Sequence, residues 1–219
     1  MSNTLLLKKL LSIKAAYYFA LIVVISLTCE FIIKKFLLTE AVYYNTYSDQ
    51  LSKDMVSNIF LFQKKMNWLT YLFDPITRVV SICYDSIFVF SLIIIKYEKT
   101  NFSSVFNICL KSAIIFNLMD ICRILNLLLF DTPKTLFDLN RIPFSLLDLI
   151  KSNESPHWLI YVLQNINIWD LLYCILGSAL MSVSLKVKFK NAIVDFILPH
   201  FLGVLFWLTL ATFLIIEIS

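Results

Sequence analysis

Glycine, proline and charge are all scarce in this sequence. The chain of 219 residues contains 2 glycines and 5 prolines. Charged residues make up 16% of it, against roughly a quarter in a typical soluble domain. So few turn residues exclude a membrane β-barrel, which needs a tight turn between most of its strands. The shortage of charge, in turn, excludes an ordinary soluble globular domain.

The sequence also lacks the short motifs that carry catalysis or metal binding. Neither of the 2 histidines has a second histidine at ligand spacing, and neither glycine belongs to a phosphate-binding loop. The five cysteines form no C-x-x-C pair, so we interpret them as small buried apolar residues. No basic stretch with interleaved aromatics indicates nucleic-acid binding. We therefore expect no enzymatic activity, no metal, no cofactor and no nucleic-acid partner.

Long apolar blocks make up much of the sequence. Hydrophobic residues make up 59% of the chain, and the mean hydropathy is +0.80. A helix of about 20 apolar residues crosses the hydrocarbon core of a bilayer. Blocks of this kind predict an all-α integral membrane bundle of about five transmembrane helices, forming one domain over residues 1–219. The expected spans are about 15–33, 76–95, 102–130, 166–185 and 193–218.

Two longer connections, 34–73 and 131–165, separate these spans and are expected near the membrane surface. Apolar residues recur at helical spacing from Leu51 to Phe62, with lysines and an aspartate between them. This pattern predicts an amphipathic interfacial helix. Asp74 followed by Pro75 has the form of a helix start, so we expect the second span to begin there.

The short basic loops predict the orientation. Lysines occur before the first span, at Lys96 and Lys99 after the second, and at Lys186, Lys188 and Lys190 after the fourth. Five spans would put these segments on one side, and basic residues favour the cytoplasm. We expect a bacterial cytoplasmic (inner) membrane protein with its N-terminus cytoplasmic and its C-terminus outside. The lysines of the first long connection oppose this orientation, although long loops follow the rule less closely.

Ionisable residues inside spans are the candidate functional residues, because each costs a few kcal/mol (about 2.5–3.5) near the bilayer centre by insertion scales. Asp120 and Arg123 lie three residues apart on one helical face and can pair, and Asp85 lies midway along the second span. These three can form either a neutral polar seam for helix or partner contacts, or a proton or ion relay. Residues near span ends (Arg78, Asp170 and Glu30) are expected to snorkel to the interface, and His200 is expected to be a polar packing residue.

A more specific pattern begins in the second connection. It comprises Leu-Asn-Arg-Ile-Pro-Phe-Ser-Leu-Leu at 139–147, Gln-Asn-Ile-Asn-Ile-Trp-Asp at 164–170, a glycine at Gly177 and a basic turn at 186–192. This order resembles prokaryotic members of the Yip1-like membrane domain family, with Asn165, Asn167, Trp169 and Gly177 as the family-like positions. The resemblance implies a five-span fold without a settled biochemical activity. The vesicle-traffic role of eukaryotic relatives is not carried over, because their Asp-Leu-Tyr-Gly-Pro-Leu-Trp type stretch is absent here.

Two functions follow as hypotheses. The first is a non-enzymatic accessory, scaffolding or regulatory subunit of a larger membrane complex, with the lipid bilayer, other membrane subunits or a second copy as partners. The alternative is a small transporter or permease component that uses Asp85, Asp120 and Arg123 along its path. A lipid-modifying enzyme would need a polar cluster that the sequence does not assemble.

Overall fold

Helices make up most of the structure, a computed structural model that describes residues 2–97, 100–130, 132–150 and 156–218. Lys99, and residues 131 and 151–155 of the second connection, lie outside these ranges. The described residues contain no strand, only one isolated antiparallel bridge between Ser145 and Asn167. The all-α fold class is therefore confirmed.

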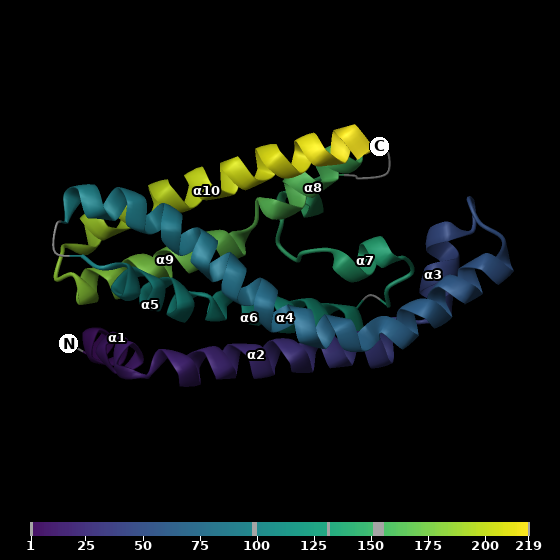
Figure 1. Cartoon of the computed structure of the whole chain (residues 1–219), viewed down its shortest axis with the longest axis horizontal. Helices are drawn as coiled ribbons and strands as arrows, with labels where there is room; N and C mark the ends of the chain where they lie inside the picture. Colours follow the sequence, from purple (N-terminus) through teal and green to yellow (C-terminus); the bar gives the residue numbers. More distant parts are fainter. Residues whose placement is uncertain (1, 98–99, 131, 151–155, 219) are drawn as a thin grey trace.

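The chain runs back and forth along one long axis (Figure 1). Helix α1 leads into α2, which continues as the π-helix η1; α3 then turns the chain into the long return helix α4. The elements are α1 (Ser2–Ser12), α2 (Ala15–Ile32), η1 (Ile33–Leu37), α3 (Glu40–Tyr47), α4 (Lys53–Lys96), α5 (Phe102–Ser112), α6 (Ile114–Leu129), α7 (Leu136–Asn140), the 3-10 helix η2 (Leu146–Leu149), α8 (His157–Asn165), α9 (Ile168–Ser184) and α10 (Phe189–Ile218).

Within the described residues, four helical segments are long and apolar enough to cross a membrane: Ala15–Leu37, Lys53–Lys96, Phe102–Leu129 and Phe189–Glu217. The remaining expected span corresponds to α9, an apolar helix of 17 residues that is shorter than these four. The short helix α8 precedes it, so this passage is divided into two pieces. The chain is an integral membrane protein whose helices contact the lipid bilayer.

The main core lies where α4, α5, α9 and α10 pack together. Val89, Cys109, Cys174, Leu180 and Phe196 are fully buried there. A smaller apolar cluster joins α2 and η1 to α6 and α7. Large apolar side chains on the outer helix faces stay exposed, as expected of a surface that contacts lipid.

Pro75 does not start a helix, contrary to the sequence prediction. Helix α4 runs without interruption from Lys53 to Lys96, with Pro75 inside it. Proline removes one backbone donor, but membrane helices tolerate that loss where neighbouring side chains support the turn. Here Arg78 and Asp74 form an i,i+4 ion pair across the proline at 3.5 Å, and the Thr77 hydroxyl donates to the Asp74 carbonyl at 2.9 Å. The expected amphipathic helix and the second span are thus one continuous helix.

Three features of the structure were not predicted from the sequence. The stretch 102–130 is divided at Ala113 into α5 and α6, where the Phe116 amide donates to the Ala113 carbonyl at 3.1 Å, across three residues. The polar lead before the first span forms helix α1, which packs against α9 and α5. The second connection contains α7, η2 and α8. These short elements were missed because tertiary contacts, rather than an apolar period, hold them in place.

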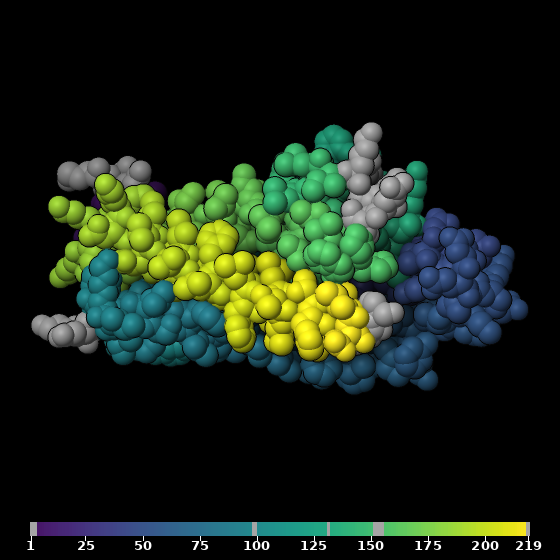
Figure 2. Space-filling model, turned by 90° about the horizontal axis from the view of Figure 1, so that it is seen from above, coloured from purple at the N-terminus to yellow at the C-terminus, as the bar shows by residue number. Residues whose placement is uncertain are grey.

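The two chain termini lie at opposite ends of the bundle (Figure 1). Helix α1 lies at the same end of the bundle as the C-terminal ends of α4 and α9 (Figure 1). At that end Lys96 Nζ pairs with Asp195 Oδ1 at 2.7 Å, and the Tyr97 hydroxyl donates to Asp195 Oδ2 at 2.6 Å. Partial burial, together with this bond to Asp195, raises the pKa of Tyr97. At the opposite end, α3 and the start of α4 lie beyond α10, as the blue residues of Figure 2 show.

We predict that Gly177→Ala weakens the contact between α9 and α10. A Cβ on Gly177 would lie 2.3 Å from Cζ of Phe196, which is fully buried. Overpacking of this kind costs about 1–3 kcal/mol, so thermal unfolding in mild detergent should begin at a lower temperature. Gly203→Ala is the matched control, because its Cβ would meet Phe88 Cγ at 3.1 Å and needs only a small adjustment. Equal melting temperatures for Gly177→Ala and the wild type would contradict the packing.

Candidate functional site

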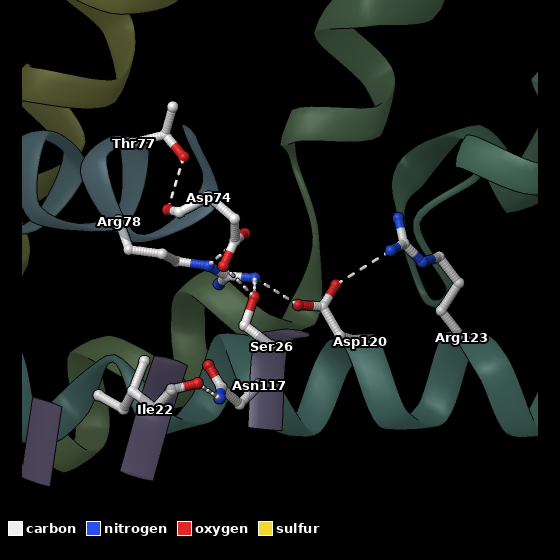
Figure 3. Close-up of polar contacts among 8 residues, drawn as sticks. All are labelled: Ile22, Ser26, Asp74, Thr77, Arg78, Asn117, Asp120 and Arg123. Atoms are coloured by element: carbon white, nitrogen blue, oxygen red, sulfur yellow. Dashed lines mark hydrogen bonds and ion pairs between the residues drawn. The ribbon is translucent and has the colours of Figure 1, made fainter. Parts of the chain in front are cut away.

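The first buried polar group, called here the ion cluster, centres on Asp120 of α6. Its Oδ2 accepts from Arg78 Nη2 of α4 at 2.7 Å, and its Oδ1 lies 3.3 Å from Nη2 of Arg123, one turn along α6. Asp120 is buried, and its two partners are mostly buried. One carboxylate therefore receives two guanidinium groups, one from α4 and one from its own helix (Figure 3).

Helix α2 completes the ion cluster. The Ser26 hydroxyl donates to Asp74 Oδ2 at 2.8 Å and accepts from Arg78 Nη2 at 2.9 Å. One turn earlier in α2, the Ile22 carbonyl accepts from Asn117 Nδ2 of α6 at 2.7 Å. Polar bonds thus tie together α2, α4 and α6, the helices that carry the residues labelled in Figure 3.

The ion cluster is balanced in charge, with two arginines facing two aspartates. Arg78 was expected to lie near a span end with its guanidinium reaching the interface, and the structure shows that this guanidinium is paired with two carboxylates. Its guanidinium turns inward because Asp74 and Asp120 offer carboxylates, whereas an isolated arginine would have to reach water. The expected pairing of Asp120 with Arg123 is present, and Arg78 is the stronger partner by distance.

A second group, called here the histidine cluster, joins α4, α9 and α10. Nδ1 of His200 lies 2.7 Å from Asp85 Oδ1, and its Nε2 lies 3.7 Å from Asp170 Oδ1. The Tyr173 hydroxyl donates to the other oxygen of Asp85. His200 is buried at 5% exposure. Asp170 was expected to snorkel to the interface. In the structure its side chain instead lies near His200 and contributes to this cluster.

The histidine cluster lies near the middle of the bundle. Asp85, Tyr173 and His200 are each eleven residues from the helix end on the α1 side, which falls at Lys96, Ser184 and Phe189 respectively. Eleven residues of helix correspond to about 16 Å, half of a hydrocarbon core about 30 Å thick. This equal spacing from the two short turns was the sequence signal that could have predicted the proximity of these three residues.

The passage from α8 to α9 is broken beside this cluster. Asn167 caps α9 by accepting from the amides of Trp169 and Asp170, and Asn165 Nδ2 donates to the Tyr161 carbonyl. The segment 143–146 folds back against the break: Leu146 N donates to the Ile166 carbonyl at 2.9 Å, and Trp169 Nε1 donates to the Pro143 carbonyl at 2.9 Å. Non-helical backbone at membrane depth is tolerated only where protein or water satisfies it.

A cavity of about 670 Å³ adjoins the ion cluster. It lies between the C-terminal part of α6 and the following connection, and Arg123, Lys134, Arg141 and Phe144 are among the residues that line it. This volume falls within the range of sites that hold small molecules, about 300–1,000 Å³. Arg123 therefore faces both Asp120 and an open space.

The structure brings together some of the predicted residues and separates others. Asp120 and Arg123 share the ion cluster, whereas Asp85 belongs to the histidine cluster. Asn165, Asn167 and Trp169 form the helix break, and Gly177 contacts Phe196. Among the described residues, no group of three histidine, cysteine or acidic side chains is arranged to hold a metal ion. No known protein family, characterised protein or solved structure matches this chain.

We predict that Asp120→Asn strongly destabilises the bundle. The change leaves Arg123 without a carboxylate and Arg78 with Asp74 alone, and breaking a buried ion pair costs about 3–5 kcal/mol. The unfolding midpoint in mild detergent, followed by circular dichroism, measures the effect. Lys96→Gln is the control, because it removes an ion pair whose lysine is half exposed and should change the midpoint far less. A similar loss in both variants would contradict a special role for Asp120.

Proposed function

We propose that this chain is a non-enzymatic multi-pass membrane protein that acts as an accessory, scaffolding or regulatory subunit of a larger membrane complex. The observation that carries the proposal is the length of α4. Its 44 residues correspond to about 66 Å of helix, roughly twice the thickness of the hydrocarbon core. About half of α4 must therefore lie outside the hydrocarbon or along its surface.

The part of α4 before Pro75 and the helix α3 form a hairpin that we call the arm. Val42, Tyr43 and Val56 are buried between its two helices, and the rings of Tyr43 and Phe60 meet edge to face at 5.4 Å. The arm is thus a packed unit rather than a loose loop. It still exposes Phe62 and Trp68, at 61% and 59%. Exposed aromatic side chains are enriched where one protein contacts another, and apolar patches of this kind mark either protein or membrane contacts.

The ion cluster supports the same proposal, because its two arginines and two aspartates balance in charge and join three helices, as expected of a structural group. Membership of the Yip1-like membrane domain family is proposed on the stretch 139–147, Asn165, Asn167, Trp169 and Gly177. The proposed setting is a bacterial cytoplasmic membrane, with α1 and the two basic turns inside and the C-terminus outside. The arm and α7 then lie on the outer side.

Co-purification from the native membrane tests the proposed subunit role. After mild crosslinking and extraction, the chain should migrate in a complex larger than one protomer. The double variant Phe62→Ala/Trp68→Ala should shift it toward the monomer by removing the exposed rings of the arm. Phe213→Ala/Leu214→Ala, at comparable exposures of 59% and 49% on α10, is the matched control and should leave the complex intact. A wild-type chain that always migrates as a stable monomer would contradict the proposal.

A second candidate, a small proton-linked transporter or permease component, is favoured by the histidine cluster. Its imidazole stands between two carboxylates at mid-depth, beside a broken helix, and substrate sites in transporters occur at such breaks. With a neutral imidazole the cluster would contain two uncompensated aspartates in a low-dielectric site. Each proton bound there removes one unit of negative charge, so the cluster is suited to taking up and releasing protons.

Proton entry into vesicles tests this second function. The purified chain, reconstituted around an enclosed pH-sensitive dye, should carry protons down an imposed pH gradient, with or without added solutes. His200→Gln should abolish the flux, because it removes the group that joins Asp85 to Asp170. Asp195→Asn removes a carboxylate at the end of the bundle and should leave the flux unchanged. Flux in the His200→Gln variant equal to that of the wild type would exclude the histidine cluster as a proton path.

A further inference from the structure

The cavity beside Arg123 has a chemical character of its own. Three cationic side chains line it, from Arg123, Lys134 and Arg141, together with apolar surface from Leu125, Phe130 and Phe144. A site that combines guanidinium and ammonium groups with apolar walls is complementary to an anionic amphiphile.

The two carboxylates that line the same cavity are already committed. Oδ2 of Asp138 accepts from the backbone amides of Lys134 and Thr135, at 3.1 and 3.0 Å. Asp148 caps the Ser145 amide with one oxygen and accepts from Arg141 Nε at 2.8 Å with the other. Arg123 Nε is buried, with no hydrogen-bond partner among the described residues. Arg141 and Arg123 are themselves paired with Asp148 and Asp120, but a guanidinium has five N–H donors, and these pairs use only some of them. The groups left over in the lining are donors, which favours an anion with several acceptor oxygens.

Phe144 gives an independent indication that something occupies this cavity. Its backbone has φ 60°, in the left-handed region, and its side chain is 66% exposed. A bulky residue rarely adopts that conformation, and strain of this kind concentrates at ligand-binding positions. The Phe144 carbonyl accepts from Ile168 N at 3.2 Å, which fixes the strained turn against the start of α9. The ring is thereby held at the edge of the cavity.

The depth of the cavity indicates the source of the anion. Arg78 of the adjoining ion cluster lies eighteen residues before Lys96, which is about 27 Å along α4. That distance nearly equals the thickness of the hydrocarbon core, about 30 Å. The cavity therefore opens at the level where phospholipid headgroups meet acyl chains on the C-terminal side of the bundle.

We propose that this cavity binds one anionic phospholipid, with its phosphate against Arg123, Lys134 and Arg141 and the upper part of a chain against Phe144. Guanidinium groups bind phosphate oxygens in pairs, and the lysine adds a point charge. The site goes beyond both functions proposed above and depends on neither of them.

Binding to the delipidated full-length chain in mild detergent tests the site. Dioleoyl phosphatidic acid should raise the melting temperature and be retained at one molecule per chain in native mass spectrometry. Dioleoyl phosphatidylcholine and inorganic phosphate should do neither. The double variant Lys134→Gln/Arg141→Gln should weaken binding of the acidic lipid by about tenfold or more, the expected effect of losing a charge-assisted contact. Lys53→Gln/Lys65→Gln removes the same charge from the arm and should bind as the wild type does.

The variant Phe144→Gly separates a binding role from a structural one. Glycine adopts φ 60° without strain, so the lipid-free melting temperature should stay the same or rise. Binding of dioleoyl phosphatidic acid should nevertheless weaken, because the ring that contacts the chain is gone. Wild-type affinity in either cavity variant, or an equal melting shift with inorganic phosphate, would overturn the proposal.

Discussion

The arrangement of this bundle depends on the cost of leaving a charge buried inside the protein without a partner. An isolated arginine or aspartate among apolar helices would cost several kcal/mol, so each must find a partner on a neighbouring helix. Asp120 meets this requirement twice, with Arg78 from α4 and Arg123 from its own helix. Ser26 brings in α2 through the same arginine. Apolar packing alone would allow these helices to slide or rotate, whereas the ion cluster accepts only one register.

The histidine cluster follows the same constraint with a different outcome. The ion cluster closes with equal numbers of opposite charges, but Asp85 and Asp170 share a single imidazole. A cluster whose charges balance suits a structural role. A cluster whose net charge changes when a proton binds suits proton exchange. The helix break at Asn165–Asn167 lies beside the histidine cluster. For this reason the arm and the ion cluster favour the subunit role, and His200 favours the transport role.

Sequence reasoning reached the class of fold because apolar block length is a direct consequence of bilayer thickness. It also paired Asp120 with Arg123, since a spacing of three residues fixes their proximity within one helix. It failed where proximity depends on tertiary structure. Arg78 reaches Asp120 across 42 residues and His200 reaches Asp85 across 115. The prediction at Pro75 failed for a related reason: local rules start a new helix there, whereas α4 continues through the proline with the ion pair between Asp74 and Arg78 across it.

A double-mutant cycle between Arg78→Gln and Asp120→Asn tests the central claim most directly. Unfolding free energies of the wild type, both single variants and the double variant in one detergent give the coupling between the two side chains. Groups in one buried network couple by about 0.5–3 kcal/mol, and a bond of 2.7 Å predicts a value in the upper part of that range. Strictly additive effects would show that the two residues do not interact, and the register imposed by the ion cluster would then be wrong.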